Sequence, residues 1–369
     1  KVINKEKIND IDLATNLKPN EVCEALKKNQ INYYETGLAH GTITALIDNY
    51  KFEITSLRED VSTDGRHAQV RFSKDWKKDA ARRDFTINSI YSDYDGNLFD
   101  PYNGKNDIEN GKINFIGHPK KRIQEDYLRI LRYVRFFLSY SKQNHNVDTI
   151  KSIREGLYGI SKLSKERLLD ELRKILNPNI LQNLSKDKFS LEIIENIFPE
   201  LKYFNIFSKL NSYAKKMINE VDFIFLISLL IIDESDNADY FLYKFNISNK
   251  DKKRIKDLDN FYKNRTINKK LNEKNLNRIF YYKGKETIID ILNFKIFKSK
   301  KMDTDIIQIL NLYKDKTIPI MPVKADVLMK KYKIQEGKIL GEKLKLIEEE
   351  WVNNNFQISD REIEIIVSG

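Results

Sequence analysis

The chain has 369 residues, of which 41% are hydrophobic and 32% are charged. This length predicts two or more domains, and the composition predicts a soluble protein with buried cores. The 65 Lys and Arg residues outnumber the 54 Asp and Glu residues, which gives a net charge of +11. That excess favours an anionic partner such as nucleic acid, although lysine-rich sequences are also common in AT-rich genomes.

The single cysteine, Cys23, excludes an internal disulfide and a cysteine-based zinc site, and the four histidines have no ligand-like spacing. We therefore expect a reducing, cytoplasmic compartment. The most apolar run, residues 223–232, is shorter than the roughly 20 residues that span a membrane, so we expect a buried helix and no membrane partner. The chain begins at Lys1 and shows no signal peptide, and we expect that an upstream segment is missing.

The first 117 residues mix strand and helix patterns. Residues 10–15 (DIDLAT) alternate polar and apolar residues, as a half-buried strand does, and Pro19 is well placed to begin a helix. The polar segment 58–75 predicts a mobile loop, because it has few apolar residues and contains an Asp-Gly turn. Further strands are predicted at residues 31–35, 42–47, 51–57 and 87–91.

Beyond Pro119, apolar residues recur at helical spacing and strand signals nearly disappear. The pattern at residues 122–137 predicts one helix, and residues 168–175 continue the same spacing. We therefore predict an α+β fold, with a mixed-sheet head followed by a long all-α arm.

Three carboxylates of the head are candidates for a catalytic centre, and two of them for metal binding. Asp10 and Asp12 lie two residues apart on the predicted first strand, so both side chains project from the same face. A divalent cation relieves the repulsion between such carboxylates, and sites rich in oxygen suit Mg²⁺. Glu53, on a later strand that could pair beside the first, is a candidate third carboxylate. Taken alone the pattern is weak, because Asp is common in turns and a strand glutamate often faces solvent.

Arg83 and Asp84 lie at the entry to a predicted strand, within the run AARRDFTINS. The planar guanidinium of an arginine suits phosphate, and a neighbouring carboxylate can accept a hydrogen bond from a ribose hydroxyl. A surface cluster of salt bridges explains the triplet Arg-Arg-Asp equally well.

The predicted helix at 122–137 carries charged residues at every third position. A carboxylate beside a guanidinium can form hydrogen bonds to a base edge. Ordinary salt bridges between residues three apart explain the same spacing, and the local pattern favours them. The residues concerned are Asp126, Arg129, Arg132 and Arg135.

The order of seven motifs along the chain points to a family. They are DIDLAT (10–15), TGLAHGT (36–42), FEITSLR (52–58), DGRHAQV (64–70), RRDFTIN (82–88), DPYNGKND (100–107) and EDYLRILR (125–132). In this order and spacing, the chain resembles the bacterial class II tRNA nucleotidyltransferases, which are the CCA-adding enzymes, and the closely similar bacterial poly(A) polymerases. The resemblance covers residues 8–175 and ends in GISKLSKERLLDELRKIL (159–176), which is similar to the neck of that family.

The resemblance implies a polymerase β-like nucleotidyltransferase head at residues 1–117, a helical neck at 118–176, and a helical body and tail at 177–369 that bind tRNA. It implies an enzyme that adds C, C and A to the 3′ end of tRNA from CTP and ATP and releases pyrophosphate. A poly(A) polymerase, an enzyme that adds only CC or only A, and a non-catalytic tRNA-binding protein stay open as alternatives.

The resemblance also implies roles for single residues. Asp10 and Asp12 match the pair that binds Mg²⁺, and Glu53 matches a catalytic carboxylate on the neighbouring strand. Arg83 matches a contact to the incoming nucleotide, and Asp84 is expected near its ribose. The selection of CTP or ATP is implied for Asp126 and Arg129, with further nucleotide contacts from Arg132 and Arg135. Residues 59–75 match a flexible loop.

One family motif is absent from the chain. Family members carry a Gly-Gly-x-x-Arg loop just before the first metal-binding strand, where it holds the triphosphate. Only nine residues precede Asp10, and none of them is a glycine. We expect the chain as given to bind nucleotide poorly for this reason.

Overall fold

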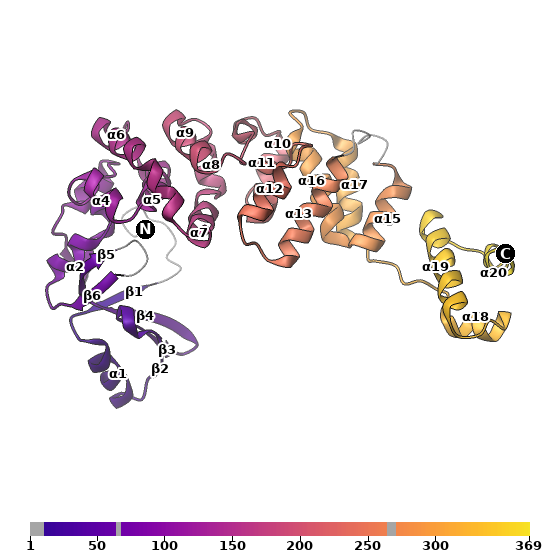
Figure 1. The fold of residues 1–369 in the computed structure, drawn as a ribbon, viewed down its shortest axis with the longest axis horizontal. Helices are drawn as coiled ribbons and strands as arrows, with labels where there is room; N and C mark the ends of the chain where they lie inside the picture. Colours follow the sequence, from indigo (N-terminus) through magenta and orange to yellow (C-terminus); the bar gives the residue numbers. More distant parts are fainter. Residues whose placement is uncertain (1–10, 64–67, 264–270) are drawn as a thin grey trace. The chain divides into compact units, whose positions relative to one another are not determined.

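The computed structural model describes residues 11–63, 68–263 and 271–369, and the chain divides into two compact units, residues 1–175 and 176–369 (Figure 1). Among the described residues, all the strands lie in the first unit, and the second unit is built from helices. This confirms the predicted α+β fold, with a mixed-sheet head followed by helices. The predicted head and neck fall together in the first unit apart from residue 176, and their exact boundaries stay a prediction.

A four-stranded mixed sheet stands at the start of the first unit, in the strand order β1-β4-β3-β2. Strand β1 runs parallel to β4, and the other neighbours are antiparallel. Val22 and Leu26, one turn apart on helix α1 (Pro19–Lys28), pack against Ile43 and Ala45 of the sheet. The strands are β1 (Asp12–Thr15), β2 (Asn32–Gly37), β3 (Thr42–Ile47) and β4 (Tyr50–Ser56).

A two-residue turn joins β3 to β4 and fixes their register. Asp48 and Asn49 have positive φ angles of 46° and 68°, the conformation that a tight hairpin of this length requires. The ladder then runs from this turn to the pair formed by Thr44 and Glu53. The short turn therefore decides where the Glu53 carboxylate lies on the sheet.

Residues 58–63 and 68–72 form two paired strands, so the prediction of a loop is wrong for these parts of the segment 58–75. Strand β5 (Arg58–Thr63) pairs antiparallel with β6 (Ala68–Phe72), and helix α2 (Trp76–Arg82) follows. Strand β5 has the polar sequence REDVST, whereas β6 (AQVRF) does alternate apolar and polar residues, and this strand signal was overlooked in the prediction. Residues 64–67, which hold the predicted Asp-Gly turn, lie outside the described residues.

The predicted strand at residues 87–91 is also wrong. The chain forms the 3₁₀ turn η2 (Thr86–Asn88), and strand pairing begins only at β7 (Tyr91–Ser92), which pairs with β8 (Leu98–Phe99). The Thr86 hydroxyl donates to Asp107 at 2.7 Å, and the Ser89 hydroxyl donates to the Thr86 carbonyl at 2.8 Å. These local side-chain bonds compete with a strand ladder and hold the chain in a turn.

Helices complete the first unit and enclose an apolar core. Ile130, Leu131 and Val134 of α5 are fully buried, as are Ile153 of α6 and Leu172 of α7. The remaining elements of this unit are η1 (Leu38–His40), α3 (Gly104–Glu109), α4 (Pro119–Glu125), α5 (Arg129–Tyr140), α6 (Val147–Gly156), η3 (Leu157–Lys162) and α7 (Lys165–Ile175).

The single helix predicted at residues 122–137 is interrupted at Asp126. Helix α4 ends at Glu125, and Asp126 adopts the extended conformation, with φ −155° and ψ 106°. Helix α5 then begins at Arg129. The spacing of three residues therefore does not place Asp126 and Arg129 on one helix, and this changes the geometry of the predicted base-reading pair.

The second unit consists of helices joined by short connections. Its elements are α8 (Pro178–Leu184), α9 (Lys188–Ile197), η4 (Phe204–Ser208), α10 (Ser212–Met217), α11 (Phe223–Ile231), α12 (Asn237–Lys244), α13 (Asn249–Tyr262), α15 (Glu273–Lys283), α16 (Lys285–Lys298), α17 (Thr304–Asp315), α18 (Ala325–Tyr332), α19 (Lys338–Asn353) and α20 (Asp360–Ser368).

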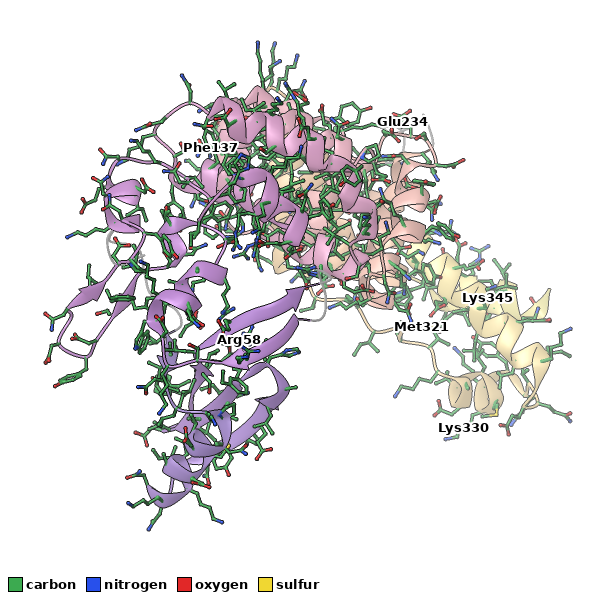
Figure 2. The ribbon with its side chains drawn as sticks, turned by 60° about the vertical axis from the view of Figure 1, so that its left-hand side comes forward. Arg58, Phe137, Glu234, Met321, Lys330 and Lys345 are labelled. Carbon is green, nitrogen blue, oxygen red and sulfur yellow. The ribbon has the colours of Figure 1, made fainter. Side chains whose placement is uncertain are left out.

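Helix α11 confirms the buried helix predicted from the most apolar run, because every residue from 224 to 231 is buried. A second apolar cluster joins the last three helices through Leu328, Leu340, Ile347 and Ile363. Met321, which is labelled in Figure 2, packs against this cluster. Of the helices that the structure describes, none is long and apolar enough to cross a membrane.

Candidate functional site

A cavity of about 970 Å³ in the first unit brings most of the predicted site residues together. Its lining includes residues of β1, β3, β4, β5, α2, β7 and α5, and of the break between α4 and α5. Asp10 lies outside the described residues, and Arg135 is not among the residues that line the cavity. The predicted residues that do line it are Asp12, Glu53, Arg83, Asp84, Asp126, Arg129 and Arg132.

Asp12 and Glu53 are direct neighbours across the parallel strands β1 and β4. Partners in such a ladder point to the same face of the sheet, so both carboxylates project on the side that lines the cavity. Two exposed carboxylates in register fit a hard cation such as Mg²⁺, which prefers oxygen ligands. In the parts of the chain that the structure describes, no group of three or more His, Cys, Asp or Glu side chains is placed to hold a metal ion.

Asp79 anchors the arginines on one wall of the cavity, although the sequence analysis did not select it. This carboxylate, only 1% exposed, accepts hydrogen bonds from Nε of Arg82 at 3.0 Å, from the Tyr91 hydroxyl at 2.7 Å and from the backbone N–H of Arg58 at 3.1 Å. Arg83 contacts it at 3.4 Å. The spacing of three and four residues from Asp79 to Arg82, the last residue of α2, and to Arg83 directly after it is a signal that could have identified Asp79.

Arg83 keeps part of its guanidinium available to the cavity. Its Nε atom donates to the Tyr91 hydroxyl at 3.1 Å, its Nη1 atom donates to the Asn88 carbonyl at 3.2 Å, and its side chain remains 37% exposed. The Arg83 guanidinium also lies 5.1 Å from the centre of the Tyr91 ring. A guanidinium has five N–H donors, so donors remain for an anionic ligand.

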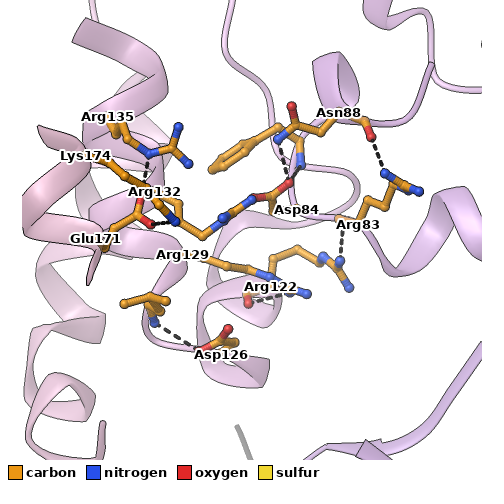
Figure 3. A network of polar contacts seen from close by, with 12 residues as sticks. Arg83, Asp84, Asn88, Arg122, Asp126, Arg129, Arg132, Arg135, Glu171 and Lys174 are labelled. Carbon is orange, nitrogen blue, oxygen red and sulfur yellow. Dashed lines mark hydrogen bonds and ion pairs between the residues drawn. The ribbon is translucent and has the colours of Figure 1, made fainter. Parts of the chain in front are cut away.

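Asp84 is buried and holds Arg132 (Figure 3). Oδ1 accepts hydrogen bonds from the Phe85 N–H and the Asn88 amide, both at 2.9 Å, and Oδ2 accepts from Nε of Arg132 at 2.6 Å. Burial raises the pKa of Asp84, but the Arg132 guanidinium and these hydrogen bonds outweigh burial, so the pKa lies below its ordinary value. The carboxylate is therefore ionised at neutral pH and fixes Arg132 at the cavity.

The side chains of Asp126 and Arg129 each bind a different partner instead of each other. Oδ2 of Asp126 accepts a hydrogen bond from Nη2 of Arg167 at 2.7 Å. Arg129 donates to Glu125 at 2.8 Å and to the carbonyls of Arg122 and Arg82 at 2.9 and 3.2 Å. The local salt bridge that the residue spacing favoured is therefore replaced by two separate interactions.

Arg135 lies one turn beyond Arg132 on α5 and forms an ion pair with the buried carboxylate of Glu171 on α7. Its guanidinium also stacks over the Phe136 ring, 4.1 Å from the ring centre. These contacts explain why the Arg135 side chain does not line the cavity.

Arg122, Glu125 and Arg167 join this network, and the sequence analysis did not select them. Arg122 donates to Glu125 and, at 2.8 Å, to the Arg82 carbonyl, and so connects α4 to α2. Glu125 and Arg122 were recognisable only as neighbours of Asp126. No local signal marked Arg167, because it lies 41 residues beyond its partner.

Comparison with known families and relatives supports one reading of this site. Residues 1–114 match the family model described as the poly A polymerase head domain, and residues 217–365 match that of tRNA nucleotidyltransferase domain 2. The chain is 46% identical over 195 residues to the mitochondrial CCA tRNA nucleotidyltransferase 1 of Homo sapiens, a match that covers 52% of this chain and 45% of the relative. The chain thus spans about half the length of that relative.

A bacterial relative is matched over a larger part of its length. The chain is 31% identical over 290 residues to the CCA-adding enzyme of Staphylococcus haemolyticus (strain JCSC1435), which covers 77% of this chain and 68% of the relative. The fold is similar to the crystal structure of the Bacillus stearothermophilus CCA-adding enzyme in complex with CTP, with a TM-score of 0.68, 19% identity and coverage of 100% of this chain and 90% of that one. The chain therefore belongs to the CCA-adding enzymes, a family of tRNA nucleotidyltransferases.

Proposed function

We propose that the protein adds C, C and A to the 3′ end of tRNA, using CTP and ATP. The observation that carries the proposal is the cavity in which the Asp12 and Glu53 carboxylates share a space with the Arg83, Arg129 and Arg132 side chains. Such a cavity combines groups suited to a metal ion with groups suited to phosphate. The names of the relatives, which are CCA-adding enzymes and CCA tRNA nucleotidyltransferases, support the same activity.

We propose that Asp12 and Glu53, together with Asp10, hold Mg²⁺ during the reaction. When bound, this ion supplies positive charge that offsets the charge developing on the phosphate oxygens. In the proposed reaction, the tRNA 3′-hydroxyl attacks the α-phosphorus of the nucleotide, a phosphodiester bond forms, and pyrophosphate leaves.

The arginines of the cavity are proposed to bind and orient the nucleotide. Arg83 has donors available for phosphate, and Asp84 keeps Arg132 charged and in place close to the nucleotide ribose. Asp126 and Arg129 are proposed to select the base, because together they present acceptors and donors. Arg135 is proposed to support Arg132 from the next turn of α5.

The second unit is proposed to bind the body of the tRNA, with residues 118–176 as the neck and 177–369 as the body and tail. The net charge of +11 fits an RNA partner, because cationic surfaces release counterions from phosphates. A solved structure of similar fold, the Thermotoga maritima CCA-adding enzyme, is a complex with tRNA. We also propose a cytoplasmic location, because a chain with one cysteine fits a reducing compartment.

One assay distinguishes this function from its closest alternative. A poly(A) polymerase remains a second candidate, because the head matches a family model described by that name. Purified protein is incubated with tRNA that lacks CCA, with CTP and ATP together, and the products are resolved at single-nucleotide length. Arrest after three additions supports CCA addition, and a long A tail supports the alternative. Binding of tRNA without any addition, under conditions that sustain a related enzyme, supports a non-catalytic role.

A further inference from the structure

Asp126 lies where the helical backbone is interrupted. It follows the last residue of α4, its backbone is extended, and α5 begins three residues later at Arg129. The neighbouring helices therefore do not fix the direction of its side chain, as they would for a residue in mid-helix. The orientation of the carboxylate depends on the groups that bind its oxygens.

Each oxygen of this carboxylate has a defined donor. The backbone N–H of Leu128 donates to Oδ1 at 3.1 Å, and Nη2 of Arg167 donates to Oδ2 at 2.7 Å. Two carboxylate oxygens offer about four acceptor positions, so acceptors remain for a ligand after both bonds have formed. The Asp126 side chain is 23% exposed and lines the cavity, and those remaining positions are accessible there.

Arg129 is held by a separate set of contacts. Its guanidinium binds Glu125 and the carbonyls of Arg122 and Arg82, none of which belongs to α7. The loss of the Arg167 guanidinium would therefore leave these contacts of Arg129 in place and remove the donor to Oδ2 of Asp126. The two halves of the proposed base-reading pair can thus be perturbed independently.

Helix α7 does not need the Arg167 side chain in order to pack. Its apolar contacts come from Leu168, Leu169 and Leu172, which are buried, whereas the Arg167 side chain is 29% exposed. Glu171, one turn beyond Arg167, holds Arg135 of α5, so one face of α7 carries partners for two charged residues of the site. Variants of Arg167 are therefore expected to fold.

We propose that Arg167 is a positioning residue for nucleotide selection, which acts by orienting the Asp126 carboxylate toward the base. This proposal rests on the proposed function. An oriented acceptor favours the amino groups of cytosine and adenine over the carbonyl oxygens that uracil and guanine present at the same place. A carboxylate that turns freely loses this preference, because it can move away from a mismatched carbonyl.

The test measures addition of a single nucleotide by purified protein, with kcat and KM for each of the four nucleoside triphosphates. Arg167→Met keeps an apolar side chain and removes the guanidinium group. In this variant the preference for CTP over UTP is expected to fall by about tenfold or more. Arg167→Lys keeps the charge and is expected to restore part of the preference. Arg173→Met, an exposed arginine of the same helix, serves as the control and is expected to keep the parental preference.

A double variant separates positioning from a merely structural role. If Arg167 acts through Asp126, adding Arg167→Met to Asp126→Ala should cause no further loss of preference. The proposal would be overturned if the double variant lost the sum of the preferences lost in the two single variants. It would also be overturned if Arg167→Met had a lower melting temperature but an unchanged nucleotide preference.

Titration of the same variants with CTP and UTP, without tRNA, tests the proposal by binding alone. If the parent adds no nucleotide, the proposed function is refuted. If the binding preference for CTP over UTP is nevertheless lower in Arg167→Met than in the parent, the role of Arg167 is supported. Equal binding preference in the parent and in Arg167→Met would refute that role.

Discussion

Replacing Asp79 with Ala should destabilise the head strongly, because this carboxylate is the shared partner of several cationic and polar groups. It is 1% exposed and accepts hydrogen bonds from Arg82, from the Tyr91 hydroxyl and from the Arg58 backbone, with Arg83 at 3.4 Å. The substitution leaves the Arg82 guanidinium, whose side chain is 18% exposed, without its charged partner. Breaking a buried pair in this way costs about 3–5 kcal/mol of unfolding free energy.

The two tryptophans of the chain make the head measurable by itself. Trp76 lies three residues before Asp79, with its ring 5.2 Å from that of Tyr91, and Trp351 belongs to the second unit. In a Trp351→Phe background, the fluorescence of Trp76 during urea unfolding reports on the head. The matched control is Asp75→Ala, which removes the N-cap of the same helix and should cost about 1 kcal/mol. If Asp79→Ala lowered the unfolding free energy by no more than Asp75→Ala does, the reasoning would be refuted.

The effect of Asp79 should also depend on pH. Burial raises the pKa of this carboxyl, but the Arg82 guanidinium, the Tyr91 hydroxyl and the Arg58 N–H outweigh burial, so the folded-state pKa lies below its ordinary value. A carboxyl with a depressed folded-state pKa contributes its stability above its unfolded-state pKa of about 3.9 and loses it as the pH falls through the folded-state pKa. The difference in unfolding free energy between the parent and Asp79→Ala should therefore be constant from pH 5 to 7, which lies about one unit or more above the unfolded-state pKa. Below pH 4 this difference should become smaller.

Three further substitutions test other parts of the structure. Asp12→Ala should abolish nucleotide addition and leave tRNA binding intact in a gel-shift assay, and an active variant would contradict the proposed metal site. Asp126→Ala should loosen the choice of CTP and ATP over other nucleotides, and an unchanged preference in single-nucleotide addition would count against base selection by this residue. Gly159→Ala should lower the unfolding free energy by about 1–3 kcal/mol, because its Cβ would lie 2.1 Å from the Tyr127 ring. Gly341→Ala, whose Cβ meets no atom within 4 Å, is the control in urea unfolding.

The sheet of the head could be predicted from the sequence because its strands carry the ordinary signals. Alternation of polar and apolar residues marked β3 and β4, and Pro19 marked the start of α1. The neighbourhood of Asp12 and Glu53 was inferred from the order of the motifs, and the parallel register of β1 and β4 agrees with it. The pairing of β5 with β6 escaped prediction because the sequence of β5 (REDVST) is polar and hides the strand, although the alternation in β6 (AQVRF) is an ordinary strand signal.

The partners of the charged residues could not be predicted, and the reason lies in the break at Asp126. Spacing along a sequence indicates which side chains can meet within one helix, and it therefore suggested a contact between Asp126 and Arg129. Once the helix is interrupted, Asp126 can reach Arg167, a residue 41 positions away on α7. That contact depends on the packing of α7 against α5, two helices that both carry fully buried apolar residues. The geometry proposed to read a base is thus set by a hydrophobic interface, and substitutions in that interface should alter nucleotide preference before they abolish folding.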